Sequence, residues 1–267
     1  MLVIGERINA TRRSIREAIK SRDMDAIVRE AKSQIEAGAN YLDVNCGTVD
    51  AAEEPAVMQW LAQGLQQAAS APLCIDSANP EALSAGLAVC RGPAMINSIS
   101  AESERFSKVL PLITEYRADV VALCMDDKGI PPDSATAEKV GRDLVRRLLD
   151  AGVPADRIYV DPLVRSVATN PETVMGTLDL MQRLAGAFDG IHFVSGLSNV
   201  SFGLPERRHL NRAYVVMSVA SGLDAVIMDP LDRTLQALIY AAEALANKDR
   251  FCMQYIGAYN EGKLSAP

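Results

Sequence analysis

Histidine and closely spaced cysteine are scarce in this sequence. Only two histidines occur among 267 residues, and the five cysteines, at positions 46, 74, 90, 124 and 252, form no Cys-x-x-Cys pair. Zinc sites use thiolates and imidazoles at close spacing, so we expect no bound metal. An odd number of cysteines without a disulfide framework is typical of a reducing compartment, and we expect a cytoplasmic protein.

Clusters of positive charge and long apolar runs are also missing. The net charge is −7, from 34 acidic and 27 basic side chains, and the basic residues do not cluster into a stripe. Nucleic acid is therefore not an expected partner. The N-terminal segment MLVIGERINATRR turns charged too soon for a secretory signal, and no run is long enough to span a bilayer. We expect no membrane partner.

Eight short apolar runs recur along the chain. They are almost continuously apolar rather than alternating, as expected of parallel strands that are covered on both faces. The predicted strands are Leu2–Ile4, Tyr41–Asn45, Leu73–Asp76, Ala94–Asn97, Val120–Met125, Ile158–Asp161, Ile191–Ser195 and Ala225–Met228.

Segments with the apolar period of a helix separate these runs. Asn79 before Pro80 marks one helix start, and glycines such as Gly38 and Gly152 mark helix ends. The predicted helices are Asp25–Ala37, Val57–Ala69, Pro80–Val89, Glu102–Tyr116, Thr136–Ala151, Pro171–Ala185, Glu206–Ser221 and Leu231–Ala246.

Strict alternation of strands and helices predicts a single α/β domain, a (β/α)8 TIM barrel. An open doubly wound sheet would usually carry a GxGxxG fingerprint after its first strand, where this chain has Gly5-Glu6-Arg7-Ile8-Asn9. The length also suits one such barrel. We expect one domain over residues 1–267, with a flexible tail at 261–267.

Polar side chains directly follow several predicted strands. Asp76, Asn97 and Asp161 end the third, fourth and sixth strands. The active site of a (β/α)8 barrel lies at the C-terminal strand ends, so we expect these side chains to share one pocket. Taken singly, Asp161 before Pro162 can start a turn and Asn97 can cap a helix. Together, acceptor carboxylates and a carboxamide suit a flat heterocycle with N–H donors, such as a reduced pterin.

Seven motifs carry a family resemblance. They are GERIN (5–9), LDVN (42–45), CIDS (74–77), MINS (95–98), DPL (161–163), GLSNVSFGLP (196–205) and LNR (210–212). In this order they resemble the pterin-binding methyltransferases that act between methyltetrahydrofolate and a corrinoid protein, which have a dihydropteroate-synthase-like TIM barrel. The resemblance covers Met1 to about Phe251, and GLSNVSFGLP is its most specific element.

The resemblance implies roles for individual residues. Asn199 would be catalytic, giving a hydrogen bond to N5 of the folate that strengthens as charge develops there. The residues that would bind the pterin are Asp76, Asn97, Asp161, Gly196 and Ser198. Further family positions near the barrel mouth are Glu6, Asn9, Asp43 and Asn45. Arg207 or Arg212 would meet the glutamate carboxylates of the folate, the alternative being that both are solvated at a helix start.

The resemblance also implies partners. The chain lacks the DxHxxG motif of familiar corrinoid modules, and we interpret His192 and His209 as structural. We therefore expect a separate corrinoid protein to dock over the barrel mouth and exchange a methyl group with N5 of tetrahydrofolate. The reaction is close to reversible, so the residues leave its direction open. The family resemblance also suggests a homodimer.

Two other functions compete with this interpretation. Dihydropteroate synthases share the fold, but that family has a lysine in the loop after the seventh strand and a basic–histidine motif after the eighth. Here those places read GLSNVSFGLP and MDPLDR, and no lysine lies between Lys139 and Lys248. A folate-binding subunit without catalytic activity is the second alternative.

Overall fold

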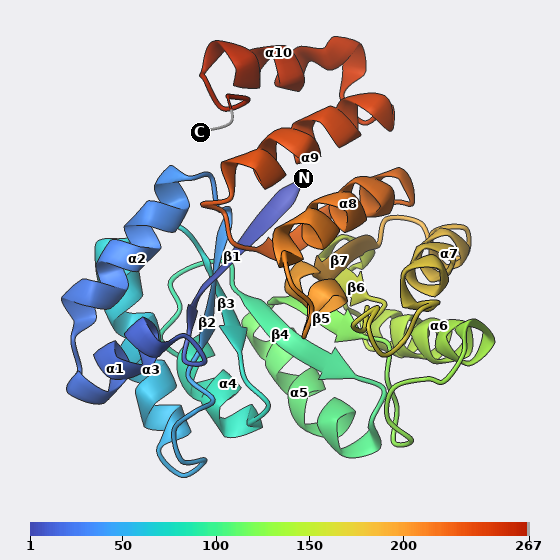
Figure 1. Cartoon of the computed structure of the whole chain (residues 1–267). Helices are drawn as coiled ribbons and strands as arrows, with labels where there is room; N and C mark the ends of the chain where they lie inside the picture. Colours follow the sequence, from blue (N-terminus) through green and yellow to red (C-terminus); the bar gives the residue numbers. More distant parts are fainter. Residues whose placement is uncertain (266–267) are drawn as a thin grey trace.

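The apolar runs form the strands of one closed barrel (Figure 1). The computed structural model describes residues 1–265, and within them the strands are β1 (Leu2–Asn9), β2 (Tyr41–Asn45), β3 (Leu73–Asp76), β4 (Met95–Ser100), β5 (Asp119–Leu123), β6 (Ile158–Asp161), β7 (His192–Gly196) and β8 (Ala225–Met228). Each strand pairs in parallel with the next along the chain, and β8 closes the barrel against β1. The predicted (β/α)8 barrel is confirmed.

Every predicted helix is present around the barrel. The helices are α2 (Met24–Glu36), α3 (Glu54–Ala68), α4 (Pro80–Leu87), α5 (Ser103–Tyr116), α6 (Ser134–Asp150), α7 (Thr173–Ala185), α8 (Arg207–Ala220) and α9 (Arg233–Leu245). Asn79 caps α4 as predicted: its side chain accepts a hydrogen bond from the N–H of Glu81, and Pro80 is the first helical residue.

Further helical segments were not predicted. These are α1 (Arg13–Ser21), α10 (Met253–Asn260) and three short 3₁₀ turns, η1 (Ala155–Arg157), η2 (Leu197–Ser201) and η3 (Arg250–Cys252). The helix α1 is short and highly charged, and it buries Ile15 and Ile19. The helix α10 has almost no buried face, so it leaves no apolar period in the sequence.

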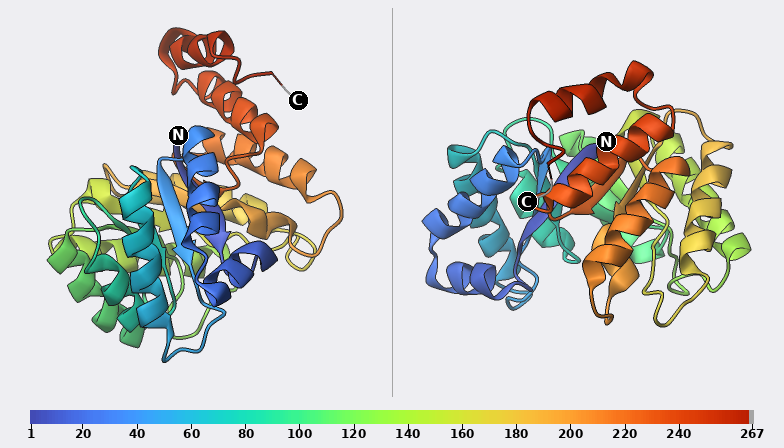
Figure 2. Two further views of the ribbon diagram at one scale, coloured as in Figure 1. Left: turned by 90° about the vertical axis from the view of Figure 1, so that its left-hand side faces the viewer. Right: turned by 45° about the horizontal axis from the view of Figure 1, so that its top comes forward.

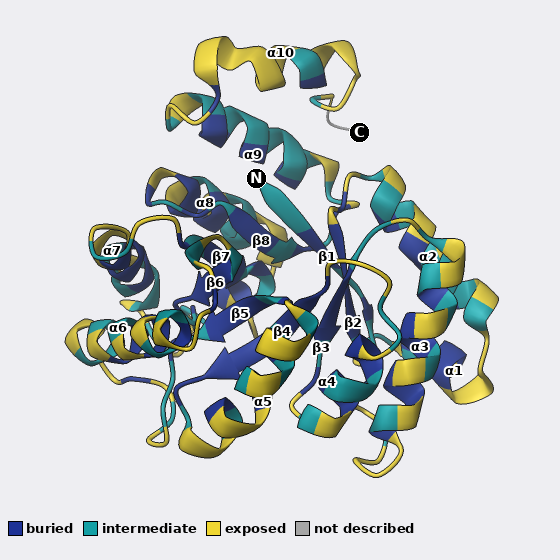
Figure 3. Cartoon of the chain, turned by 180° about the vertical axis from the view of Figure 1, so that it is seen from behind, coloured by how far each residue is buried: buried dark blue, intermediate teal, exposed yellow. Residues whose placement is uncertain are grey.

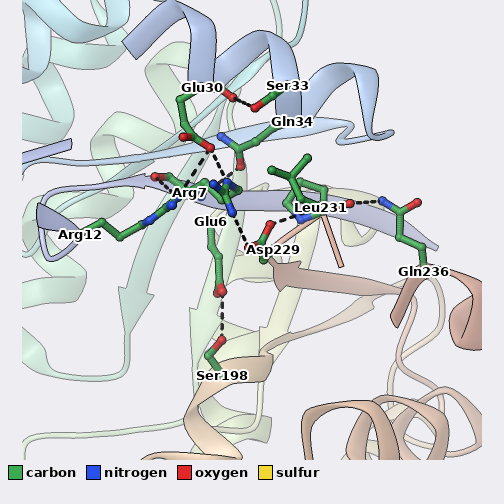
Figure 4. Close-up of polar contacts among 11 residues, drawn as sticks. Glu6, Arg7, Arg12, Glu30, Ser33, Gln34, Ser198, Asp229, Leu231 and Gln236 are labelled. Atoms are coloured by element: carbon green, nitrogen blue, oxygen red, sulfur yellow. Dashed lines mark hydrogen bonds and ion pairs between the residues drawn. The ribbon is translucent and has the colours of Figure 1, made fainter. Parts of the chain in front are cut away.

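The first strand is longer than predicted. The prediction ended at Ile4 because charged residues follow, yet β1 continues to Asn9 with a register shift after Gly5. The charge of Arg7 is matched by Glu30 of α2 and, at 2.6 Å between Nη1 and Oδ2, by Asp229 after β8 (Figure 4). These ion pairs allow a strand with charged residues to close the barrel.

The apolar core has two layers separated by the sheet. One layer fills the inside of the barrel and includes Ile4, Tyr41, Cys74, Met95, Val121, Tyr159, Val194 and Ala225. The larger layer lies between the strands and the helices, where Figure 3 shows the buried sides of the helices facing the barrel. His192 begins β7, stacks on Tyr159 with ring centroids 4.8 Å apart, and places Nδ1 2.7 Å from Asp224. It therefore lies at the end of the barrel opposite the mouth.

The C-terminal end returns toward α9. The carbonyl of Gly262 accepts a hydrogen bond from Arg233, and the N–H of Lys263 donates to Ala258. Of the predicted flexible tail at 261–267, residues 266–267 lie outside the described part of the chain. None of the helices formed by residues 1–265 has the length and apolar character needed to cross a membrane.

Candidate active site

A row of polar side chains crosses neighbouring strands at the mouth of the barrel. Asn9 of β1 stands opposite Asn45 of β2, Asn45 opposite Asp76 of β3, and Asp76 opposite Asn97 of β4. Register partners in a parallel sheet point to the same face. The strand-end positions taken from the sequence therefore converge at the C-terminal edge of the barrel.

Amide–carboxylate hydrogen bonds connect this row. Asn45 Nδ2 donates to Asp76 Oδ2 at 2.9 Å, and Asn97 Nδ2 donates to Asp43 Oδ1 at 3.1 Å. Asp43 is buried inside the barrel two residues before Asn45. Each carboxylate keeps further lone pairs for a ligand, because a carboxylate can accept about four hydrogen bonds.

Burial changes the acid–base behaviour of the first two carboxylates. Burial raises the pKa of Asp43, and the neighbouring charge of Asp76 raises it further. Burial also raises the pKa of Asp76 to about 6, against the lowering effects of the hydrogen bond from Asn45 and the charge of Arg105. Two carboxyl groups this close do not ionise independently, so they titrate as a pair.

Asp161 lies on the same edge at the end of β6. Its Oδ1 accepts a hydrogen bond from the N–H of Leu163 at 2.8 Å. Burial raises the pKa of Asp161 to about 6, and hydrogen bonds from the backbone N–H groups of Leu163 and Gly196 oppose that rise. A ligand that donates N–H groups to Asp161 would further favour the ionised form.

A cavity of about 530 Å³ opens beside this row. It runs from the ends of β3 and β4 to the start of α5, and its volume suits a small organic ligand. The residues that line it include Asp76, Ser77, Asn97, Ser98, Glu102, Arg105 and Lys108. Its wall combines polar and apolar groups, with Leu123 on the apolar side.

Arg105 is the lining residue that sequence reasoning missed. From the first turn of α5 its guanidinium donates hydrogen bonds to the carbonyls of Ser77, Ala78 and Ser98. These residues come directly after Asp76 on β3 and after the corresponding asparagine on β4. Arg105 thus fixes the backbone just beyond both side chains. The segment SERF gives no signal for this role, since it reads as an exposed helix start.

The loop after β7 is held from two sides. Ser198 Oγ donates to Glu6 Oε1 of β1 at 3.0 Å, across the barrel mouth (Figure 4). Arg207 donates to the carbonyl of Ser198 and, at 3.1 Å from Nε, to Ser201 Oγ. Burial raises the pKa of Glu6, and the hydrogen bond from Ser198 opposes this rise.

Asn199 and Gly196 lie in close contact in this loop. A side chain added at Gly196 would place its Cβ 3.0 Å from Asn199 Nδ2, a tight approach that glycine permits. The side chain of Asn199 is exposed at the mouth. A small residue at 196 therefore lets the amide of Asn199 lie against the end of β7.

Several other predicted residues have structural partners. Asn9 Oδ1 accepts hydrogen bonds from the N–H and hydroxyl of Thr11, so Asn9 stabilises the turn after β1. Arg212 pairs with Asp232 at 2.7 Å, which joins α8 to the start of α9. Arg207 is exposed and contacts the β7 loop. Binding of a folate carboxylate by either arginine stays a prediction.

The model of the pterin binding enzymes matches residues 5–229. This chain belongs to the pterin-binding enzyme family. The match includes every site residue named above from Glu6 to Arg212, and it ends before α9 and α10.

Two proteins with different names are similar in sequence to this pterin-binding enzyme. The methylcorrinoid:tetrahydrofolate methyltransferase of Eubacterium limosum is 33% identical over 266 residues, which cover 99% of this chain and 98% of that protein. The methionine synthase of Mycobacterium tuberculosis is 32% identical over 244 residues, 85% of this chain but 20% of its own length.

Solved structures agree on the fold. The dihydropteroate synthase of Xanthomonas albilineans with 4-aminobenzoic acid has a TM-score of 0.70 at 23% identity, covering 92% of this chain and 93% of its own. The dihydropteroate synthase of Coxiella burnetii with pteroic acid has a TM-score of 0.70 at 15% identity, covering 93% and 94%. At these identities the likeness extends to the fold alone.

Proposed function

We propose that this enzyme transfers a methyl group between N5 of tetrahydrofolate and the cobalt of a corrinoid carried on a separate protein. The observation that carries the proposal is the 33% identity, over almost the full length of both chains, to a protein named methylcorrinoid:tetrahydrofolate methyltransferase. The family match supports pterin binding by this chain, and the methionine synthase relative supports methyl transfer as the reaction.

The strand-end row supports pterin binding. A pterin edge presents amine and amide N–H donors, and the half-buried Asp76 and the buried Asp161 supply carboxylate acceptors. Asn97 adds an amide that both donates and accepts. An analogue that lacked a donor would leave a buried carboxylate oxygen unpaired, which costs about 1–3 kcal/mol and would give selectivity for the pterin.

Asn199 is the residue that we propose to act at N5. When the methyl group leaves as a cation equivalent, N5 keeps the electron pair of the broken bond and takes up a proton. A hydrogen bond from the exposed amide of Asn199 would stabilise that developing charge more than the ground state, which makes it catalytic. Its support is positional: the loop that carries Asn199 is fixed by Ser198 and Arg207 beside the mouth.

The barrel mouth also offers a surface for a corrinoid protein. Exposed apolar side chains stand on the loops after β5, β7 and β8, where Ile130 is 46%, Phe202 70% and Leu231 39% exposed. Apolar groups of this size on a surface are typical of sites where a protein partner docks. Because the corrinoid must approach the folate, we propose that its carrier covers this rim.

The test is a stopped-flow reaction of the enzyme with 5-methyltetrahydrofolate and free cob(I)alamin. We expect the Co(I) absorbance to fall and the methyl-Co(III) absorbance to rise in one enzyme-dependent phase, with the reverse change when methylcobalamin meets tetrahydrofolate. Folate binding without any change in the cobalt spectrum, repeated with a cobalamin-loaded corrinoid protein, would favour a non-catalytic folate-binding subunit. Release of dihydropteroate from 4-aminobenzoate and a pterin pyrophosphate would instead favour a synthase.

A further inference from the structure

Two neighbouring loops at the barrel mouth are joined to each other. We call the loop between β6 and α7, residues 162–172, the β6 loop. The loop between β7 and α8, residues 197–206, is the β7 loop, and it carries Asn199. Figure 2 shows the helices that follow the two loops, α7 in gold and α8 in orange, side by side on the outside of the barrel. The β6 loop also begins directly after Asp161, one of the proposed pterin acceptors.

Two hydrogen bonds connect these loops directly after Asn199. Ser166 Oγ donates to the carbonyl of Phe202 at 2.6 Å. The N–H of Val167 donates to the carbonyl of Val200 at 3.0 Å. Phe202 in turn donates its own N–H to the carbonyl of Asn199 at 3.2 Å. Ser166 is thereby linked, through one residue, to the backbone that carries the Asn199 side chain.

The β6 loop is itself fixed to a strand and to a helix. Leu163 has a left-handed backbone (φ 60°), which leucine rarely adopts, and its N–H donates to Asp161 Oδ1 at 2.8 Å. The N–H of Arg165 donates to Thr173 Oγ1, at the start of α7, at 3.0 Å. A loop that is tied to a strand end and to a helix start is a rigid support for the loop beside it.

The side chain of Asn199 depends on such support. Its amide is exposed, and no other group within residues 1–265 forms a hydrogen bond with it. Its direction therefore follows from the backbone of the β7 loop. The bonds from Ser198 to Glu6 and from Arg207 to Ser198 hold the residue before Asn199, whereas the β6 loop holds the residues after it. Both sides together fix where the amide points.

We propose that Ser166 is a positioning residue for methyl transfer, which acts through the β7 loop on the amide of Asn199. This inference rests on the proposed function, in which that amide acts at N5 of the folate. A hydrogen bond weakens steeply when it is misaligned, and a displacement of about 1 Å at a reacting centre can lower the rate about a hundredfold. The hydroxyl of Ser166 is used within the two loops, since it also accepts the N–H of Ala168 at 3.3 Å. Its removal should therefore lower the rate of transfer and leave the pterin acceptors in place.

The experiment is a double-mutant cycle on Ser166 and Asn199. Single-turnover stopped-flow with 5-methyltetrahydrofolate and cob(I)alamin measures the rate of transfer, and calorimetry measures the folate Kd. Ser166→Ala should slow transfer about tenfold, or about 1.4 kcal/mol, with a change in folate Kd of less than about twofold. Ser166→Thr keeps the hydroxyl and should restore most of the rate. In the Asn199→Ala background Ser166→Ala should have no further effect, because the group that it positions is gone.

Thr169→Val is the matched control within the same loop. The hydroxyl of Thr169 donates to the carbonyl of Ser166 at 3.3 Å and does not reach the β7 loop. We expect this variant to transfer methyl groups and bind folate as the wild type does. A rate as low as that of Ser166→Ala would show that any change in the β6 loop slows transfer, and it would overturn the assignment.

The remaining outcomes also decide the assignment. An unchanged rate in Ser166→Ala would overturn it. The same fold loss in the wild-type and Asn199→Ala backgrounds would do so too, because it indicates a general structural role. A loss confined to the folate Kd would place Ser166 in folate binding instead. A wild type that transfers no methyl group, or an Asn199→Ala variant as fast as the wild type, would refute the proposed function and this inference with it, and both are measured before Ser166 is changed.

Discussion

Replacing Asp161 by asparagine should stabilise the ligand-free enzyme while it weakens folate binding. Asp161 is buried at the end of β6, and burial raises its pKa to about 6. At neutral pH the folded protein therefore holds a carboxylate in surroundings that disfavour its charge. Asparagine has nearly the same shape and can still accept the hydrogen bond from Leu163, but it carries no charge.

The magnitude follows from the difference in proton binding between the two states. In the folded state the pKa is about 6, against 3.8 for the unperturbed group. Because the folded-state pKa is the higher one, the contribution of Asp161 to stability is fully present below pH 3.8 and is lost as the pH rises through about 6. At 1.36 kcal/mol per pKa unit the full loss is about 3 kcal/mol. Roughly 1.4 kcal/mol of it falls between pH 5 and pH 7.5.

The assay is urea unfolding of the wild type and Asp161→Asn at pH 5 and pH 7.5. We expect the advantage of the variant to grow by about 1.4 kcal/mol between the two values, with a net gain of about 2 kcal/mol at pH 7.5 after weaker hydrogen bonds are allowed for. Saturating folate should reverse the order, since ligand at 100 times its Kd adds about 2.7 kcal/mol to the wild type. A variant whose advantage did not grow with pH would refute the reasoning. Exposed Asp189→Asn is the matched control, because its carboxylate stays in water in both states.

Further substitutions test the remaining parts of the site. Asn199→Ala should lower single-turnover methyl transfer more than folate affinity, whereas Asp76→Ala should lower both by similar factors; equal ratios in the two assays would remove Asn199 from the chemistry. Arg105→Met should weaken folate binding about tenfold or more, measured by calorimetry, because hydrogen bonds from a charged donor contribute about 1.5–3 kcal/mol; unchanged affinity would contradict this. Ser198→Ala should slow transfer several-fold, because it removes the hydrogen bond that holds the loop of Asn199 to Glu6, while Glu6→Gln, which can still accept that hydrogen bond, should stay close to wild type.

Much of the barrel could be predicted because its strands are covered on both faces. β2, β3, β6 and β8 have the predicted bounds, since each apolar run ends at a polar or turn residue. β1 was underestimated because its charged residues are matched by partners far along the chain, such as Asp229. The helix α10 could not be predicted, because a helix without a buried face leaves no apolar period in the sequence.

Some residues of the site could be predicted from their position in the sequence, whereas the roles of others depend on tertiary contacts. Strand-end residues such as Asp76 and Asn97 are recognisable because the fold brings all strand ends to one edge. Arg105 is not recognisable, since its role depends on carbonyls of β4 and of the loop after β3, which are distant in the sequence. Arg212 was predicted from its position to meet a folate carboxylate; the structure pairs it with Asp232, directly before α9, and the ligand contact stays a prediction.

The raised pKa values connect the stability of the barrel to its proposed ligand. Asp76 and Asp161 both have a pKa of about 6, and Asp43 beside them is also raised, each chiefly through burial. N–H donors of a bound pterin would satisfy these carboxylates and lower their pKa values, so binding near pH 6 should release protons. Affinity should therefore increase as the pH rises through 6 and level off above it. Without a ligand, the carboxylates of the barrel mouth reduce the stability of the protein, because their charges are desolvated. A ligand whose N–H groups donate to them removes this cost. A heterocycle without those donors would leave the charges buried and unpaired, so the mouth selects for a ligand that has them.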